Sequence, residues 1–414
     1  MNDVIIIGAG PAGLSASISC ARFGLKALVI DEFMKPGGRL LGQLHQEPTG
    51  EWWNGIEESK RLHEEAKSLS VDIRCGISVY NLDKDESSWY VHTNIGTLEA
   101  PFVLLATGAA EYSIPLPGWT LPGVMSIGAA QVMTNVHRVQ VGEKGIIIGA
   151  NILSFAILNE LQLAGIKVEH IVLPEKSELS QQAGEPEEVL NSLLNAAHLA
   201  PSAFLRIGSH FMKYDWIRKA GLTFYPNSGM KINGTPLHLR KAALEIIGTD
   251  QVEGVRVANI DTKGNIVTGS EQIYEADFVC IAGGLYPLAE LAAVAGCPFR
   301  YIPELGGHVP LHSETMETPL AGLFVAGNIT GIESGKIAMA QGTVAGLSIA
   351  KYASKKRDIV DQQLTRAIQN VHFVRQKAAI QFNPMVDIGR RTMNDLWHKF
   401  QTNDNDFYKQ QEIL

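Results

Sequence analysis

Three glycines near the N-terminus have the spacing that a dinucleotide-binding turn requires. Gly8, Gly10 and Gly13 form a GxGxxG motif directly after the apolar run 4–7. The first glycine permits a tight turn, the second lets the backbone approach a pyrophosphate, and the third lets a helix pack closely on a strand. A helix that starts at Pro11 would point its free N–H groups and the positive end of its dipole at the phosphates. The motif therefore predicts a pyrophosphate site.

The elements that must position this turn are a strand before it, a helix after it and a second strand. The pattern predicts a strand at 4–7, a helix at 11–22 and an apolar strand at 27–30 that ends in Asp31 and Glu32. A carboxylate at the end of the second strand accepts hydrogen bonds from a ribose. Strand, turn, helix, strand and acid together predict a complete βαβ unit, which is far more specific than a glycine turn alone.

A second copy of this pattern carries altered chemistry. The apolar run 146–148 leads into Gly149, in the manner of the first unit. However, Asn151, Ser154 and Val172 stand where the first unit has two glycines and the acid. Because side chains at the glycine positions obstruct a pyrophosphate, we expect a second Rossmann-type domain without a working nicotinamide site.

Two such units predict an α/β fold in which one nucleotide-binding domain is inserted into another. Buried strands at 276–284 and 321–328 and a small-residue helix at 336–353 are expected to complete the first domain. The tail is charged and helical in pattern, and it reads equally as a docking surface and as a cap on the chain's own fold. The expected limits are 1–115 and 276–354 for the first domain, 116–275 for the second and 355–414 for the helical tail.

Composition excludes several classes of protein. The 414 residues carry 35 Lys and Arg against 43 Asp and Glu, so the net charge of −8 argues against nucleic-acid binding. No apolar stretch reaches the roughly 20 residues of a membrane span, and the N-terminus lacks the positive charge of a signal peptide. The cysteines form no CxxC pair, so we expect no metal site and a cytoplasmic location. They are Cys20, Cys75, Cys280 and Cys297.

The motifs together resemble the two-dinucleotide-binding-domain flavoproteins of the glutathione reductase and thioredoxin reductase type. The matching strings are GAGPAG at 8–13, PGG at 36–38, ATG at 106–108 and AGN ending at Asn328. Within that group, PGWTLPGV at 117–124 and GIESG at 331–335 resemble the flavin subunits of heteromeric amine and imino-acid dehydrogenases. These include hydrogen cyanide synthase, opine oxidase and D-hydroxyproline or proline dehydrogenase.

The resemblance implies a non-covalent FAD site and a glutathione-reductase-like fold of two nested Rossmann-type domains. It gives Asp31 the adenosine ribose, the Val79 backbone the adenine, and Asn328 the ribityl position usually held by an aspartate. The helix from Lys336 would point its N-terminus at the pyrimidine edge of the flavin. The cofactor positions that it implies are Gly8, Gly10, Pro11, Ala12, Gly13, Asp31, Glu32, Gly38, Arg39, Gln43, Val79, Ala106, Thr107, Gly108, Gly327, Asn328, Lys336, Ile337 and Ala338.

The resemblance further implies an FAD-dependent oxidoreductase, the electron-transferring flavin subunit of a heteromeric dehydrogenase. The amine or imino acid (hydroxyproline, proline, an opine or glycine) would be oxidised on a partner subunit with a second flavin. Disulfide reduction is excluded because the redox-active cysteine pair of the reductases is missing. No cysteine follows Cys297, so any iron–sulfur cluster would belong to a separate small protein. The alternatives are a stand-alone NAD(P)H-dependent flavin reductase and a nucleotide-binding module without chemistry of its own.

Overall fold

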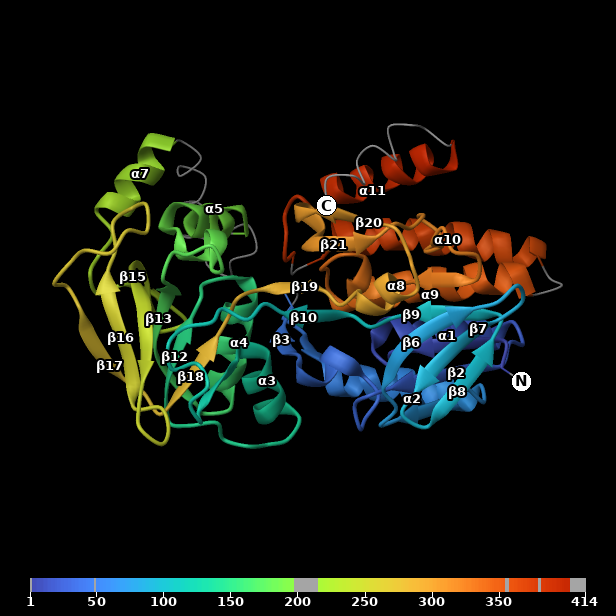
Figure 1. Ribbon diagram of the computed structural model, residues 1–414, viewed down its shortest axis with the longest axis horizontal. Helices are drawn as coiled ribbons and strands as arrows, with labels where there is room; N and C mark the ends of the chain where they lie inside the picture. The colour runs from blue at the N-terminus through green and yellow to red at the C-terminus, as the bar shows by residue number, and fades with distance from the viewer. Residues whose placement is uncertain (1, 48–49, 197–214, 354–356, 379–380, 403–414) are drawn as a thin grey trace. The chain divides into compact units, whose positions relative to one another are not determined.

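The chain folds into two compact units, each built on its own sheet. The computed structural model describes residues 2–47, 50–196, 215–353, 357–378 and 381–402 (Figure 1). Unit 1 comprises the described parts of 1–43, 54–110 and 285–414, and unit 2 comprises those of 44–53 and 111–284. The segment 44–53, which contains β3 (Leu44–Gln46) and most of β4 (Trp52–Asn54), thus belongs to unit 2. The sequence did not predict this assignment.

Unit 1 contains a five-stranded sheet in which every neighbouring pair is parallel. Its strands in spatial order are β22 (Leu323–Val325), β9 (Phe102–Leu105), β1 (Val4–Ile7), β2 (Ala27–Asp31) and β5 (Asp72–Cys75). All four residues of β1 are buried, as expected for a central strand covered on both faces. The predicted strands 4–7, 27–30 and 321–328 therefore belong to one sheet.

Two helices beside this sheet pack closely because small residues face each other. They are α1 (Pro11–Arg22) and α9 (Gly335–Ala353), which correspond to the predicted helices 11–22 and 336–353 (Figure 1). A Cβ atom on Gly342 would lie 2.0 Å from the carbonyl oxygen of Ala12, and one on Gly346 would lie 2.4 Å from that of Ala16. Only glycine therefore permits this helix–helix distance. Helix α2 (Gly55–Ser68) also contacts α1.

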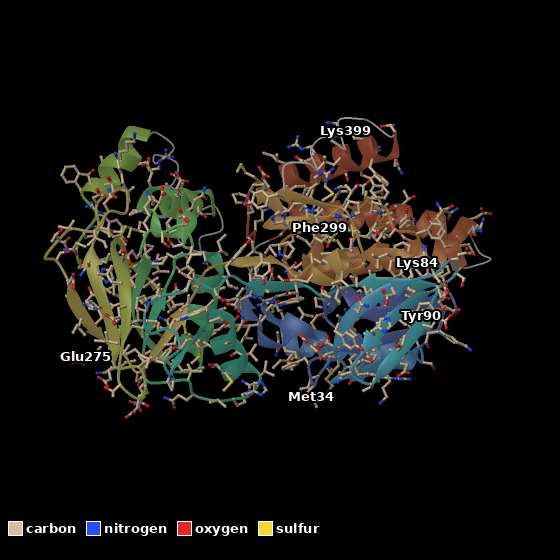
Figure 2. All side chains as sticks on the ribbon, viewed as in Figure 1. Met34, Lys84, Tyr90, Glu275, Phe299 and Lys399 are labelled. Atoms are coloured by element: carbon tan, nitrogen blue, oxygen red, sulfur yellow. The ribbon has the colours of Figure 1, made fainter. Side chains whose placement is uncertain are left out.

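An antiparallel sheet completes this part of unit 1. It consists of β6 (Val79–Lys84), β7 (Trp89–Thr93) and β8 (Gly96–Ala100). Lys84 Nζ and Trp89 Nε1 both donate to the carbonyl oxygen of Ala321, at 2.7 and 3.1 Å, which ties this sheet to the residues before β22. Lys84 and Tyr90 mark its position in Figure 2.

Unit 2 is a second Rossmann-type unit. Its strands in spatial order are β11 (Val124–Ser126), β18 (Phe278–Ile281), β12 (Lys144–Ile148), β13 (Lys167–Pro174), β15 (Thr235–Ile247), β16 (Gly254–Asn259) and β17 (Gln272–Glu275), with β14 (Met230–Ile232) beside β15. The α-helices that the structure describes in this unit are α3 (Ile127–Asn135), α4 (Ile152–Leu163), α5 (Pro186–Ala196) and α7 (Asp215–Thr223).

The structure corrects one predicted domain limit. The sequence pattern predicts that 276–284 belongs to the returning first domain, but β18 pairs in parallel with β12 and β11 of unit 2. The chain returns to unit 1 only at Leu285. A short apolar strand that ends in glycines has the same pattern in either sheet, so its sequence alone could not distinguish them.

The described part of the tail contains two helices, which pack on other parts of unit 1. Helix α10 (Arg357–Gln376) contacts α9 (Figure 1). Helix α11 (Val386–Gln401) buries Val386, Met393 and Leu396 against Ile302, Leu305, Val309 and Leu311. Of the predicted tail, 355–356, 379–380 and 403–414 lie outside the described residues. None of the helices that the structure describes is both long and apolar enough to cross a bilayer.

Unit 1 contains further short elements, and two strands lie near its limits. The short elements are β20 (Phe299–Ile302), β21 (Gly307–Pro310) and α8 (Glu290–Val294). The two strands near the limits are β10 (Ala109–Glu111) and β19 (Leu285–Pro287).

Candidate functional site

The glycine turn after β1 has the geometry that the motif predicts. Gly8 has a φ of +110°, and a Cβ atom there would lie 2.3 Å from the carbonyl oxygen of Ala106. A Cβ atom on Gly13 would lie 1.9 Å from the carbonyl oxygen of Gly8. Both glycines are therefore required by the chain's own packing at the end of β1.

Gly10 is different, because the protein itself leaves room for a side chain there. A Cβ atom on Gly10 would meet only the Cα atom of Gly38, at 4.0 Å, and its φ of −75° suits any residue. Gly10 is also the N-cap residue of α1, and it has no side chain with which to cap the helix. The first N–H groups of a helix lack intrahelical partners. Open space beside uncapped N–H groups fits the pyrophosphate of FAD.

Asp31 is oriented by the same turn. Its Oδ2 accepts a hydrogen bond from the Ala9 N–H at 2.6 Å, and its Oδ1 accepts one from the Phe33 N–H at 2.8 Å. Burial raises the pKa of this carboxyl above its usual value, while the two N–H groups oppose that shift. Each oxygen has a further lone pair for a ribose hydroxyl. Glu32, the other predicted acid, is exposed.

The segment after β2 lies against the turn. Gly38 begins the 3-10 helix Gly38–Gly42, and a Cβ atom on it would lie 3.0 Å from the Cα atom of Gly10. Arg39 donates from Nε and Nη2 to the carbonyl oxygen of Ala109, at 3.1 and 2.9 Å. Gln43 Oε1 lies 3.5 Å from the position of a Cβ atom on Gly335, the first residue of α9.

The residues after β22 meet the turn from the other side. A Cβ atom on Gly327 would lie 2.9 Å from the Cβ atom of Ala12, in the first turn of α1. Asn328 Oδ1 accepts the N–H of Glu333 at 3.2 Å, which uses one of the two lone pairs of this oxygen. Its Nδ2 group has no partner among the described residues and can donate to a hydroxyl.

The remaining predicted positions have smaller roles in the geometry. Ile337 and Ala338 are buried, so only their backbone is available to a ligand, whereas Lys336 is half-buried. Thr107 Oγ1 donates to the carbonyl oxygen of Leu288 at 2.5 Å, and the carbonyl of Gly108 accepts the N–H of the same residue. Val79 begins β6 and packs on the core of unit 1.

The corresponding turn of unit 2 is closed by its own side chains. Asn151 caps α4: its Oδ1 accepts the N–H of Ser154 at 2.9 Å, and Ser154 Oγ accepts the N–H of Asn151 at 3.0 Å. Asn151 Nδ2 also donates to the carbonyl oxygen of Ala282 at 2.9 Å. The N–H group that would face a phosphate is thus already bonded, and Val172 is fully buried and apolar.

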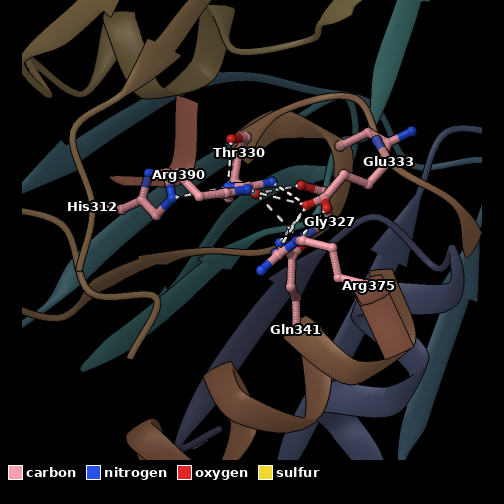
Figure 3. A network of polar contacts seen from close by, with 8 residues as sticks. His312, Gly327, Thr330, Glu333, Gln341, Arg375 and Arg390 are labelled. Atoms are coloured by element: carbon pink, nitrogen blue, oxygen red, sulfur yellow. Dashed lines mark hydrogen bonds and ion pairs between the residues drawn. The ribbon is translucent and has the colours of Figure 1, made fainter. Parts of the chain in front are cut away.

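Sequence reasoning missed a buried ion-pair network beside residues 327–335 (Figure 3). The carboxylate of Glu333, 3% exposed, accepts Arg375 Nε at 2.5 Å and Arg390 Nη2 at 2.5 Å. Gln341 bridges this pair to the site, since its Oε1 accepts the Gly327 N–H at 3.1 Å and its Nε2 donates to Glu333 at 3.3 Å. The one signal available was an acid within the small, apolar GIESG string, because a buried acid requires a cation.

His312 completes the network in its neutral form. Its Nδ1 lies 2.7 Å from the carbonyl oxygen of Pro310, so it carries the proton, and Nε2 faces Arg390 Nη1 at 3.4 Å as the acceptor. Burial, helped by the Arg390 charge, lowers the pKa of His312 from 6.5 to about 3. The histidine therefore supports the arginine rather than acting as a base at neutral pH.

This pKa shift predicts an acid-sensitive fold. The folded pKa lies below the unfolded value, so the stabilisation is complete above pH 6.5 and is lost as the pH falls toward 3. We expect the free energy of unfolding to fall by about 1.4 kcal/mol per pH unit in that window. Denaturant titrations at several pH values should show a shallower slope for His312→Gln, which retains a donor and an acceptor. His398→Gln, on the exposed side of α11, is the control, and equal slopes for all three proteins would contradict the assignment.

Comparisons with known proteins identify relatives of this chain. Residues 2–176 match the family model described as pyridine nucleotide-disulphide oxidoreductase, and residues 309–357 match that of glucose inhibited division protein A. An opine oxidase subunit of Rhizobium meliloti is 26% identical, and the aligned region covers 84% of this chain and 62% of that protein. Hydrogen cyanide synthase subunit HcnB of Pseudomonas aeruginosa is 26% identical over 83% of this chain and 70% of its own.

A solved structure supports the fold. L-proline dehydrogenase from P. horikoshii has a TM-score of 0.61 and 19% identity over 88% of this chain and 58% of its own. The predicted α/β fold of two Rossmann-type units with C-terminal helices is confirmed.

Proposed function

We propose that this FAD-binding oxidoreductase is the electron-transferring flavin subunit of a heteromeric amino- or imino-acid dehydrogenase. The observation that carries the proposal is the contrast between the two glycine turns. The first is open at Gly10 and uncapped, whereas the second is filled by Asn151 and Ser154. A chain with one dinucleotide site and no nicotinamide site would have no place to bind NAD(P)H. This favours a flavin that receives its electrons from a partner subunit.

The relatives support an assembly of several chains. The opine oxidase and hydrogen cyanide synthase relatives are each named as subunits. The chain spans less than two thirds of the length of that opine oxidase relative, so the substrate class and the partners belong to the proposal. We infer an opine, hydroxyproline, proline or glycine type of substrate, bound mainly by a second flavin subunit.

Each group of residues would have a definite task in this site. When bound, FAD would accept the two electrons that leave the substrate on the partner subunit and would pass them on. The N–H groups at the start of α1 would hold its pyrophosphate, and Asp31 would hold the ribose. Asn328, Gly38 and Gln43 would line the flavin side of the site. Arg39, which donates to the carbonyl oxygen of Ala109, would hold the 3-10 helix Gly38–Gly42 in place on this side.

An iron–sulfur centre, if the assembly has one, would come from a separate chain. All four cysteines are free, and Cys280 lies in unit 2 while the other three lie in unit 1. Burial raises the pKa of the Cys20 and Cys297 thiols to about 12, so the thiolates that a cluster needs are disfavoured. Free buried thiols also support our assignment of the protein to the reducing cytoplasm.

The test is the source of electrons for the bound flavin. We expect NADH or NADPH to reduce the purified yellow protein far more slowly than about 10 per second, the median enzyme turnover. The flavin absorbance of the complex isolated from the native host should fall when an opine, hydroxyproline, proline or glycine is added. The complex should also contain a second flavin subunit. Fast reduction of the isolated chain by NADPH would favour the stand-alone flavin reductase. Bound FAD that stays oxidised with every one of these reductants would favour a nucleotide-binding module.

A further inference from the structure

Two arginines of the tail helices are buried together with one carboxylate, that of Glu333 in the segment 327–335 (Figure 3). The side chains of Arg375 and Arg390 are 8% and 12% exposed, and that of Glu333 is 3% exposed. Two cations against one anion leave one net positive charge. Burial raises the pKa of Glu333, but Arg390 and Arg375 together lower it below its usual value, so the acid is ionised.

Among the residues that the structure describes, the groups around the network do not cancel this charge. His312, in contact with Arg390, is neutral at pH 7 because burial lowers its pKa. His372 pairs with Glu314 at 2.7 Å, and both are exposed. Asp387, the other acid near Arg390, is exposed and therefore screened by solvent.

The network is joined directly to the segment that contacts the glycine turn. The Glu333 N–H donates to Asn328 Oδ1, and Gln341 links the Glu333 carboxylate to the Gly327 N–H. Arg390 Nη1 donates to the carbonyl oxygen of Thr330 at 2.8 Å, and Thr330 Oγ1 donates to that of Gly327. The tail helices therefore fix the backbone on the flavin side of the site, between β22 and α9.

We propose that Arg375 and Arg390 are positioning residues for FAD, which hold residues 327–335 through Glu333 and raise the reduction potential of the flavin by their net positive charge. The inference rests on the proposed function, because it requires FAD in the unit 1 site. Two-electron reduction of FAD with uptake of one proton leaves one negative charge on the ring, and a nearby positive charge stabilises that product.

The decisive experiment compares substitutions that break the same network but change the charge in opposite directions. Arg390→Met removes a positive charge, and Glu333→Gln removes a negative one. We expect the ratio of reduced to oxidised flavin at a fixed potential to fall about tenfold in Arg390→Met and to rise in Glu333→Gln. For a two-electron couple, tenfold corresponds to about 30 mV in a dye-equilibration titration of the holoprotein.

Two further variants separate charge from general damage. Arg390→Lys retains the charge and should keep the wild-type potential, while Arg391→Met changes the neighbouring exposed arginine and should alter nothing. If Arg390→Met does not fold, Arg375→Met gives the same test with the Arg390–Glu333 pair in place. Shifts of the same sign in Arg390→Met and Glu333→Gln, or no shift in either, would overturn the inference. Absence of FAD from the wild-type protein would instead overturn the proposed function.

Discussion

Gly10→Val is expected to give a folded protein without flavin colour. A Cβ atom at this position would meet only the Cα atom of Gly38, at 4.0 Å, so we expect the fold to tolerate the substitution. However, it fills the space beside the start of α1 where the pyrophosphate would accept backbone hydrogen bonds. The loss of two such charge-assisted bonds weakens FAD binding by at least about a hundredfold. Visible absorbance and a titration of the apoprotein with FAD measure the effect.

The neighbouring glycine provides the contrast. Gly13→Ala places a Cβ atom 1.9 Å from the carbonyl oxygen of Gly8 and should disrupt the packing of α1 on β1 itself. Circular dichroism should therefore show a native Gly10→Val protein and an unfolded or aggregated Gly13→Ala protein. A yellow Gly10→Val protein with one FAD per chain would show that the cofactor lies elsewhere.

A chain ended after Ala353 is expected to lose both its FAD and its stable fold. The truncation removes both arginines that pair with Glu333, and an unpaired buried charge costs about 3–5 kcal/mol. It also uncovers the apolar cluster around Leu305, where each large side chain lost from α11 contributes about 1.5–3 kcal/mol. The sum is comparable to the whole stability of a typical domain, about 5–15 kcal/mol.

The matched control ends after Thr402 and retains every contact of α10 and α11 that the structure describes. Solubility, thermal unfolding and flavin content of the two truncated proteins should differ sharply. A soluble, yellow protein ending at Ala353 would mean that the tail is dispensable for the fold and free to serve as a docking surface, the alternative that the sequence left open.

The local parts of this molecule follow from the sequence because short-range physics decides them. The strand–turn–helix–strand unit from Val4 to Asp31 depends on buried apolar runs and on glycines at fixed spacing, and both are visible in one stretch of chain. The residues Asn151 and Ser154, which replace two glycines, likewise indicate that the second turn differs from the first. The cofactor class is therefore readable from residue types, through the chemistry of the phosphate-facing backbone.

Only the tertiary structure decided which distant segments meet. Strand β18 could join either sheet by its pattern, and its register with β12 placed it in unit 2. The tail showed only amphipathic helices, yet Arg375 and Arg390 reach Glu333 across 42 and 57 residues of sequence. Such pairings depend on the free energy of bringing residues that are distant in sequence together in the protein interior. No local periodicity of the sequence encodes that free energy. The sequence alone thus predicted which turn would bind a dinucleotide, and only the fold showed which charged side chains lie beside the segment 327–335.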